Sequence, residues 1–354
     1  MTGPTSSHRR GPVPSLLGAI ARPFYQAAID WRNRRFDAAT NNPGRIKRLP
    51  IPVISVGNLS VGGTGKTPMV RWLAGYLSSE QGGRQRPLIA LRGYRQQATG
   101  GISDEAEEYR SLLPGVPLAI GADRFAAVQQ ALSASSGQSP SVVLLDDGFQ
   151  HRQLARNFDL VLIDATRPPM TDALIPLGWL REEMSSLRRA HAVVVTRSSD
   201  ADPSSVEAIL SAARTANPAL VTAVTSHALT LPDAANNQRV LVVSGIGNPG
   251  PFTRAVGALA RVVGALEFED HVSYGSKRIL EIERRAHASG ATMLVTTGKD
   301  AAKLNRLAPG TLGLPVVAAG LSLVFERGER ELCAAVSTAL GTRPREHPGD
   351  SHPA

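Results

Sequence analysis

Residues 51–72 read IPVISVGNLSVGGTGKTPMVRW, an apolar segment followed by a glycine-rich turn and then by the beginning of a helical pattern. Strand, glycine-rich loop and helix, in this order, form the context in which backbone amides hold phosphate groups. The loop ends in Gly-Lys-Thr as a Walker A sequence does, but Ser60 stands where that pattern has its first glycine. The stretch predicts a nucleotide-binding site in which one position of the Walker A pattern is altered. The alternative is an ordinary glycine-rich turn.

In such a site, the loop glycines allow the backbone to approach the phosphates closely. Lys66 would reach the β- and γ-phosphates, and the hydroxyl of Thr67 would bind Mg²⁺. Ser60 must avoid a positive φ or accept a strain of about 1 kcal/mol. The residues expected to bind the nucleotide are Ser60, Val61, Gly62, Gly63, Thr64, Gly65, Lys66 and Thr67.

A second apolar run ends in two acids, in the sequence VVLLDDGFQH at residues 142–151. A carboxylate at the end of a buried strand beside a phosphate loop is the Walker B arrangement, which holds Mg²⁺. Asp146 or Asp147 would take this role, and the sequence leaves open which one. The alternative is an Asp-Asp-Gly turn with no metal.

Short apolar runs alternate with helical patterns along the chain, which predicts an α/β fold with a mostly parallel sheet. A polar region at residues 198–238 separates two such patterns. We expect a larger domain at residues 16–228, a smaller α/β domain at 229–341, and disordered ends at 1–15 and 342–354. The expected strands are residues 53–56, 88–91, 142–145, 160–163, 193–195, 240–243 and 293–296; the main expected helices are residues 205–213, 252–260, 277–288 and 329–340.

The net charge of the 354-residue chain is +9, and residues 1–50 carry most of it, with nine basic and two acidic residues. The rest of the chain is nearly neutral, which argues against a broad surface for nucleic acid. A basic N-terminus suits an anionic membrane surface or an anionic substrate. The only cysteine, Cys333, excludes an internal disulfide and a cysteine-based zinc site.

Residues 16–36 have the apolar spacing of an amphipathic helix, with Phe24 and Trp31 near its apolar face and arginines beside it. Such a helix can lie in a membrane interface, or it can pack on its own domain. No apolar run approaches the roughly 18–20 residues of a membrane span.

Eight segments occur in the order that is typical of one family: VGNLSVGGTGKTP (56–68), LRGY (91–94), SDEAEEY (103–109), LLDDGFQH (144–151), LIPLGWLREEMSSLRRA (174–190), SGIGNP (244–249), FEDHVSY (268–274) and TTGKDAAKL (296–304). From about residue 16 to about residue 330, the chain resembles the tetraacyldisaccharide 4′-kinases of lipid A biosynthesis. LLDDGFQH and the Asp-His segment, beside a phosphate loop, are the most specific of these motifs.

The resemblance implies a P-loop NTPase-like α/β/α core domain, a smaller α/β/α domain and catalysis between them. It implies transfer of the γ-phosphate of ATP, with Mg²⁺, to the 4′-hydroxyl of a tetraacylated glucosamine disaccharide 1-phosphate, which gives lipid IVA. The enzyme would be bound through its N-terminal helix to the cytoplasmic face of the bacterial inner membrane. We expect a monomer whose partners are the lipid disaccharide and the membrane surface.

The family's functional residues carry over to matching positions. Asp104 corresponds to the catalytic aspartate and His271 to the histidine that pairs with it across the cleft; Lys66 completes the catalytic set. A carboxylate can take the proton of a sugar hydroxyl as the new bond forms, and a histidine can orient it. Without the resemblance, Asp104 would be read as a loop or helix-cap acid and His271 as a surface histidine. The resemblance places Arg92, Tyr94, Glu105, Arg124, Arg181 and Glu182 at the substrate, with Glu105 assisting the metal or the substrate. For the charged residues of the cleft and the Arg-Glu pair, the alternative is surface ion pairing.

The chain departs from the family pattern at several positions. Gly298 stands where a glutamate is usual in TTEKD, and a leucine precedes Arg92 where a serine is usual. Trp179 and Glu183 stand where prolines are common. None of these positions lies in the phosphate loop, although acyl-chain specificity could differ.

The main alternative is a P-loop GTPase, or another nucleotide-driven switch that binds a partner protein. Guanine selection in such proteins uses an [NT]KxD motif. In the nearest candidate here, Lys299 and Asp300 are adjacent, so the spacing is wrong. Another small-molecule kinase or an ATP-dependent ligase on the same fold is the third class.

Overall fold

The computed structural model of the chain describes residues 15–38, 45–93, 104–135, 137–246, 249–269, 272–304 and 312–341. The ends that the sequence predicts to be disordered lie outside these ranges, apart from Ser15, which begins the first helix. The helices are α1 (Ser15–Asp37), α2 (Lys66–Ser78), α4 (Asp104–Leu112), α5 (Arg124–Ser133), α6 (Pro203–Ala216), α7 (Pro249–Gly257), α8 (Ser276–Ser289), α9 (Gly298–Leu304) and α10 (Glu329–Leu340). The strands are β1 (Val53–Asn58), β2 (Pro87–Leu91), β3 (Leu118–Ile120), β4 (Val142–Asp146), β5 (Phe158–Asp164), β6 (Ala192–Thr196), β7 (Val221–Thr230), β8 (Arg239–Ser244), β9 (Arg261–Glu267), β10 (Met293–Thr297) and β11 (Val316–Arg327).

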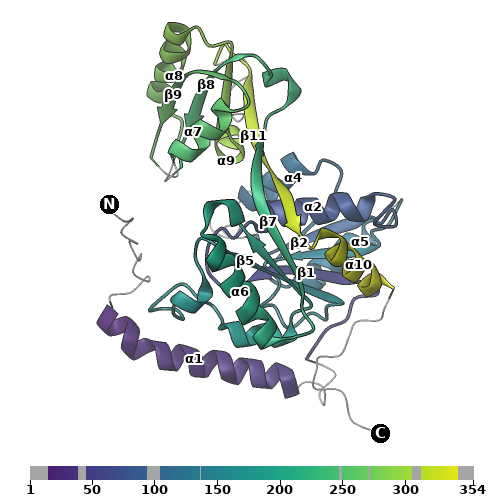
Figure 1. Cartoon of the computed structure of the whole chain (residues 1–354). Helices are drawn as coiled ribbons and strands as arrows, with labels where there is room; N and C mark the ends of the chain where they lie inside the picture. Colours follow the sequence, from purple (N-terminus) through teal and green to yellow (C-terminus); the bar gives the residue numbers. More distant parts are fainter. Residues whose placement is uncertain are drawn as a thin grey trace. The chain divides into compact units, whose positions relative to one another are not determined.

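The chain forms two compact units (Figure 1). The first unit comprises Met1–Gly93, Gly115–Ser226 and Leu323–Ala354, and the second comprises Tyr94–Pro114 and His227–Ser322. The units therefore do not follow the linear division at residue 228 that the sequence suggests. Helix α4 contacts α9 and belongs to the second unit, while β11 and α10 return the chain to the first.

The first unit contains a parallel sheet with the strand order β3-β2-β4-β1-β5-β6-β7. All five strands expected in this part of the sequence are present, and the α/β fold class is confirmed. Strands β3 and β7 are additional, and β7 occupies part of the region that reads as a polar boundary. Strands β1, β2, β4, β5 and β6 are buried along their whole length, as expected for parallel strands that are covered on both faces.

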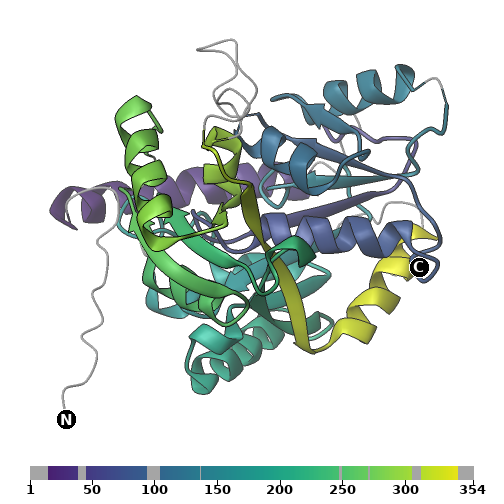
Figure 2. The ribbon, with the colours of Figure 1, turned by 90° about the horizontal axis from the view of Figure 1, so that it is seen from above.

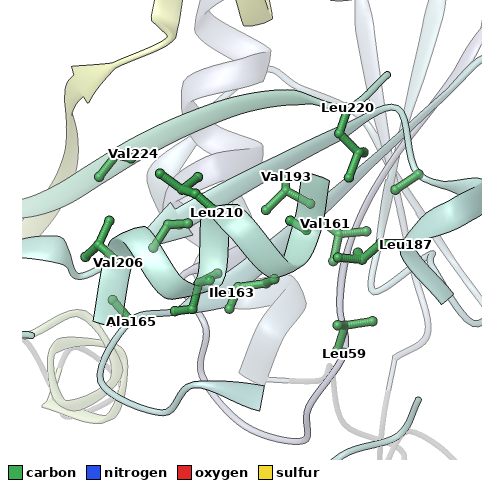
Figure 3. Close-up of a cluster of buried hydrophobic side chains, with 14 of the residues drawn as sticks. Leu59, Val161, Ile163, Ala165, Leu187, Val193, Val206, Leu210, Leu220 and Val224 are labelled. Carbon is green, nitrogen blue, oxygen red and sulfur yellow. The ribbon is translucent and has the colours of Figure 1, made fainter. Parts of the chain in front are cut away.

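One face of this sheet packs against α6 (Figure 3). Val161 and Ile163 of β5 and Val193 of β6 meet Val206 and Leu210 of the helix. Helix α6 begins at Pro203, two residues before the expected start at residue 205, and Asp202 caps it by accepting a hydrogen bond from the Ser204 amide. This packing fixes the ends of β5 and β6, which carry part of the site described below.

The second unit contains a parallel sheet with the order β11-β10-β8-β9. Alternate residues of β8 enter two different cores: Leu241 and Val243 face the cluster that includes α8, and Val240 and Val242 face the cluster that includes α7. This period of two is that of a strand with both faces buried. Figure 1 shows α7 and α8 beside β8 and β9.

The end of β11 and the C-terminal helix α10 pack against α2 in the first unit. The rings of Trp72 and Phe325 lie 4.6 Å apart, and the Tyr76 hydroxyl donates to the carbonyl of Cys333 over 3.2 Å. Figure 2 shows α10 in yellow ending beside α2 in blue. The last expected helix, residues 329–340, is confirmed with the same bounds, but it belongs to the unit that holds the phosphate loop.

Helix α1 is continuous through Pro23 and runs along the outside of the first unit in Figure 1. A surface helix usually buries its apolar side chains and exposes its polar ones, and α1 shows the reverse. Asn33 is buried, whereas large apolar side chains are exposed: Leu17 by 60%, Ile20 by 61%, Phe24 by 74% and Trp31 by 61%. Within the described residues, no helix is long and apolar enough to cross a membrane. The helix is thus both packed on its own unit and apolar toward solvent.

Candidate active site

The candidate site lies at one edge of the first unit's sheet. Strands β4, β1, β5 and β6 are neighbours and run parallel. Their carboxyl ends therefore meet at the same edge, which is where ligands bind in open α/β sheets. The phosphate loop follows β1 and leads into α2, so the strand–loop–helix context that the sequence predicts is present.

The loop takes its left-handed conformations from glycines. Gly62 has φ 118° and Gly65 has φ 88°, values that glycine adopts at little cost. Ser60 is not among the described residues with positive φ. It pairs with Leu180 in an antiparallel bridge, and the neighbouring Val61 amide donates to the Trp179 carbonyl over 2.8 Å. The backbone at Ser60, where the Walker A pattern has a glycine, is therefore unstrained. The loop that carries Trp179 and Leu180 holds it in an extended conformation.

The middle of the loop is sterically open. A Cβ atom added at Gly62 or at Gly63 would meet nothing within 4 Å. An open, glycine-rich stretch at the N-terminus of α2 suits the close approach of a polyanion, since the first amides of a helix lack partners within the helix.

Lys66 and Asp147 face each other across the site. The Nζ atom of Lys66 lies 3.5 Å from Oδ1 of Asp147, and Nη1 of Arg181 lies 2.7 Å from Oδ2. Burial raises the pKa of Asp147, but the two cations outweigh it and hold the pKa below its usual value. Asp147 is therefore a carboxylate at neutral pH, with both of its oxygens directed at cations.

The residues after this carboxylate fit only one backbone path. A Cβ at Gly148 would lie 2.6 Å from Oγ of Ser55, and a Cβ at Gly57 would lie 2.5 Å from Cβ of Phe149. Both contacts are shorter than packed atoms allow. The sequence Asp-Asp-Gly-Phe can thus lie against β1 only because both positions are glycine, and this path turns Asp147, at φ 51°, toward Lys66.

His151 lies beside the site and stays neutral. Burial lowers its pKa to about 4. The positive charges of Arg124, Arg156 and Arg92 act in the same direction. Two arginines expected at the substrate, Arg92 and Arg124, are therefore close enough to influence the same imidazole. Arg92 is exposed just after β2, whereas Arg124 is 5% exposed at the start of α5.

Glu182 sits beside Arg181 in sequence but points into the protein. It is 0% exposed, and its oxygens accept hydrogen bonds from Asn33 and Arg32 of α1 over 3.1 and 3.3 Å. Arg189 and Ser186 donate to it as well, over 2.9 and 3.1 Å. Burial raises the pKa of Glu182, but the charges of Arg189 and Arg32 outweigh it and lower the pKa. Glu182, expected to bind substrate, joins α1 to the loop that carries Arg181.

A model of the family described as tetraacyldisaccharide-1-P 4′-kinase matches residues 15–340. The chain belongs to this family. It is 35% identical over 308 residues to the tetraacyldisaccharide 4′-kinase of Chlorobium chlorochromatii, covering 79% of this chain and 81% of the relative. It is 34% identical over 325 residues to that of Geobacter sulfurreducens, covering 85% and 88%.

A solved structure of a tetraacyldisaccharide 4′-kinase relative agrees with this assignment. The crystal structure of LpxK from Aquifex aeolicus, described as an "apo" form in complex with ATP, has a TM-score of 0.66 and 28% identity to this chain. The similarity covers 90% of this chain and 97% of that one. It therefore includes both units and is not confined to the phosphate loop.

The family's other expected residues belong to the second unit or lie outside the described residues. Asp104 begins α4, but its side chain is not among those described. Glu105 follows it in α4 and is exposed. Tyr94 and His271 lie outside the described residues. The catalytic pairing of Asp104 with His271 stays a prediction.

Two departures from the tetraacyldisaccharide 4′-kinase pattern have structural reasons. The backbone N–H of Trp179 donates to Oδ1 of Asp172 over 3.2 Å, and the carboxylate of Glu183 accepts from Gln26 of α1 over 3.3 Å. Proline has neither group. At Gly298, the first residue of α9, an added Cβ would meet nothing within 4 Å, so a glutamate would fit.

The sequence did not single out three residues that touch the phosphate loop or its support: Asp164, Thr196 and Arg197. Asp164 and Thr196 are the last residues of β5 and β6, and Arg197 follows β6. The sequence offered one signal that these residues belong to the site: each lies at or after the end of an apolar strand that is expected in the same sheet as β1. Parallel strands end at the same edge of the sheet, where ligands bind.

Proposed function

We propose that the protein transfers the γ-phosphate of ATP to the 4′-hydroxyl of a tetraacyldisaccharide 1-phosphate, to form lipid IVA. The observation that carries this proposal is the Lys66–Asp147–Arg181 arrangement beside an open phosphate loop, in a chain that matches the kinase family along its folded length. The relative crystallised with ATP supports the choice of nucleotide.

The phosphate loop would bind the triphosphate through the residues from Ser60 to Thr67. Lys66 would exchange its contact with Asp147 for the β- and γ-phosphates, where its charge offsets the charge that develops during transfer. Arg181, held by Asp147 at 2.7 Å, would keep that carboxylate oriented once Lys66 has turned to the nucleotide.

The residues present fit a magnesium ion. Magnesium is commonly held by one or two carboxylates together with substrate phosphates, and not by an all-protein cage. Thr67 and Asp146 would hold the ion, and Asp147 would stay paired with Arg181 through Oδ2. The ion would neutralise charge on the phosphates.

In the reaction, Asp104 would take the proton of the 4′-hydroxyl while the 4′-oxygen forms its bond to the γ-phosphorus. The bond from that phosphorus to the β–γ bridging oxygen breaks, and ADP leaves with the electron pair. His271 would orient Asp104. Arg92, Tyr94, Glu105 and Arg124 would bind the acceptor, whose 1-phosphate is an anion suited to arginine. Glu182 acts indirectly, through the placement of Arg181.

The N-terminal helix would bring the enzyme to the cytoplasmic face of the inner membrane. Its exposed Phe24 and Trp31 are the kinds of side chain that enter the interface, and Arg34 and Arg35 suit anionic lipids. Because the opposite side of α1 is polar and packed on the first unit, the apolar side is available to a lipid surface. We expect a monomer that binds no nucleic acid.

The deciding experiment is incubation of the protein with Mg²⁺, tetraacyldisaccharide 1-phosphate and either ATP or GTP, followed by mass measurement of the lipid. One added phosphate with ATP, and loss of this product in Lys66→Ala, is expected. Lys277→Ala, which removes an exposed lysine of the second unit, is the control. Hydrolysis of GTP without phosphorylated lipid would instead favour the switch class, which family membership does not support.

A further inference from the structure

Two carbonyl groups of the phosphate loop are held by the end of β6 and the residue after it. Oγ1 of Thr196 donates to the carbonyl of Thr64 over 3.0 Å, and Nη2 of Arg197 donates to the carbonyl of Gly63 over 2.9 Å. Thr196 is completely buried. Successive loop carbonyls are thus fixed from a strand far away in the sequence.

Arg197 is itself held in place. Its Nη1 atom donates to Oδ2 of Asp164 over 2.8 Å. The other oxygen of Asp164 accepts from the amide and the hydroxyl of Thr166, over 3.0 and 2.7 Å. The Asp164 carboxylate is 6% exposed and the Arg197 side chain 34%. One guanidinium nitrogen of Arg197 therefore bonds the buried Asp164 carboxylate, and the other bonds the Gly63 carbonyl of the loop.

The backbone of Arg197 is strained. Its φ and ψ of 57° and 36° lie in the left-handed region, which a residue with a Cβ atom adopts only at an energetic cost. Such strain persists only where surrounding contacts determine it, and it concentrates at functional sites. Here the contacts that determine it are those to Asp164 and Gly63.

Fixing a carbonyl also fixes the next amide, because both belong to one planar trans peptide and point in opposite directions. The contact of Thr196 with the Thr64 carbonyl therefore orients the Gly65 N–H, and the contact of Arg197 with the Gly63 carbonyl orients the Thr64 N–H. The latter donates to the Gly62 carbonyl over 3.1 Å in this structure. Contacts within the protein thus fix the shape of the loop.

We propose that Arg197 is a positioning residue for nucleotide binding, which clamps the phosphate loop to β5 and β6 through Gly63 and Asp164. The proposal rests on the proposed function, because it assumes that the loop binds the phosphates of ATP. Since Asp164 offsets the charge of Arg197, the role is geometric. A lysine would keep the charge but has one nitrogen, which cannot take the place of two guanidinium nitrogens.

The test compares MgATP affinity, measured by calorimetry without the lipid acceptor, in the full-length wild type, Arg197→Gly, Arg197→Lys and Lys66→Ala. Arg197→Gly is chosen because glycine tolerates the left-handed backbone, so the fold is retained. We expect both Arg197 variants to bind ATP about tenfold or more weakly, the loss typical for removal of hydrogen bonds to a charged group. Their KM for ATP should rise, and their KM for the lipid acceptor should not change.

The control is Arg214→Ala, which removes an arginine bonded to Thr222 over 3.3 Å at the end of α6 and should bind ATP normally. Wild-type affinity in Arg197→Gly overturns the proposal, and so does full recovery in Arg197→Lys, since charge alone would then suffice. If Lys66→Ala also binds ATP normally, the phosphate-loop assignment fails as well. If only Lys66→Ala loses affinity, that assignment stands without the clamp.

Discussion

The Asn33 side chain of α1 donates a 3.1 Å hydrogen bond to Glu182, a carboxylate with no exposure to solvent. Arg181, the preceding residue, bonds Asp147 in the candidate active site. The N-terminal helix and the site are thus connected through two adjacent residues. Deletion of residues 1–35 would therefore remove more than the helix proposed to bind the membrane, because it would uncover Glu182 and take away two of its hydrogen-bond donors.

Glu182→Ala is expected to lower the free energy of unfolding by about 3–5 kcal/mol, since it leaves the buried Arg189 without its anion. Urea unfolding followed by circular dichroism measures this. Glu183→Ala is the matched control. It removes a half-buried acid that accepts one bond from Gln26, and should cost about 1 kcal/mol or less. Equal losses in both variants would contradict the anchoring role of Glu182.

The double variant Phe24→Ser and Trp31→Ser is expected to weaken binding to vesicles of phosphatidylethanolamine and phosphatidylglycerol at least tenfold. Each side chain is more than half exposed, and burying a large apolar side chain contributes about 1.5–3 kcal/mol. Sedimentation with vesicles measures binding, and thermal unfolding should be unchanged. Leu280→Ser, at an exposed leucine of α8, controls for lost surface hydrophobicity. Unchanged sedimentation of the double variant would leave α1 as a packing element only.

Asp104→Asn is expected to lower kcat by about 10²–10⁴, the usual contribution of a general base. Phosphorylated lipid, quantified over a range of acceptor concentrations, gives kcat and KM separately. Glu105→Gln alters the next residue of α4 and should act mainly on KM, if at all. A rise in KM for Asp104→Asn with kcat intact would make Asp104 a binding residue.

Acid should destabilise the protein through His151. Its pKa is about 4 in the folded protein and near 6.5 when unfolded, so the unfolded state binds more protons between these values. Its contribution to stability is complete above about pH 6.5 and is lost as the pH falls toward 4. Unfolding free energies at pH 7 and pH 5 should differ less in His151→Gln than in the wild type. An identical pH dependence would show that the imidazole is not buried as described.

Gly298→Glu is expected to be tolerated and to stabilise the second unit slightly. The position is open, glycine is a poor helix former, and an acid in the first turn of α9 interacts favourably with the helix dipole by about 0.3–1 kcal/mol. Thermal unfolding measures the change in stability. Gly245→Ala is the comparison variant, which should be destabilised. There a Cβ would lie 2.4 Å from Val272, so a clear loss is expected. Destabilisation by Gly298→Glu would mean that α9 starts differently.

The sequence was most informative where the signal is local. The phosphate loop, the Asp146–Asp147 pair and the buried strands of the first unit follow from apolar runs and glycines within about ten residues. Strand β11, VVAAGLSLVFER, was not expected: Gly320 and Ser322 interrupt its apolar residues, and none of its residues is buried. Strand β9, which is 7 residues long and has no buried residue, was likewise not expected.

The candidate site was less predictable than the fold, because its contacts join distant segments. Glu182 reads as a site residue beside Arg181, and only its bonds to α1, about 150 positions earlier, show that it faces inward. In the sequence, nothing distinguishes Arg197 from other polar residues that follow a strand. Only the fold shows its hydrogen bond to the Gly63 carbonyl. Such assignments depend on tertiary structure and not on spacing along the chain.

The return of α10 to the first unit has a consequence for biosynthesis. Trp72 and Tyr76 stack on each other within α2, but their contacts with Phe325 and Cys333 form only after the whole second unit has been made. At a translation rate of about 5–20 residues per second, the 248 residues between Tyr76 and Phe325 take roughly 12–50 s to make. During that time the side of α2 that carries Trp72 and Tyr76 is exposed on the nascent chain. A chaperone that binds aromatic side chains would bind at this side.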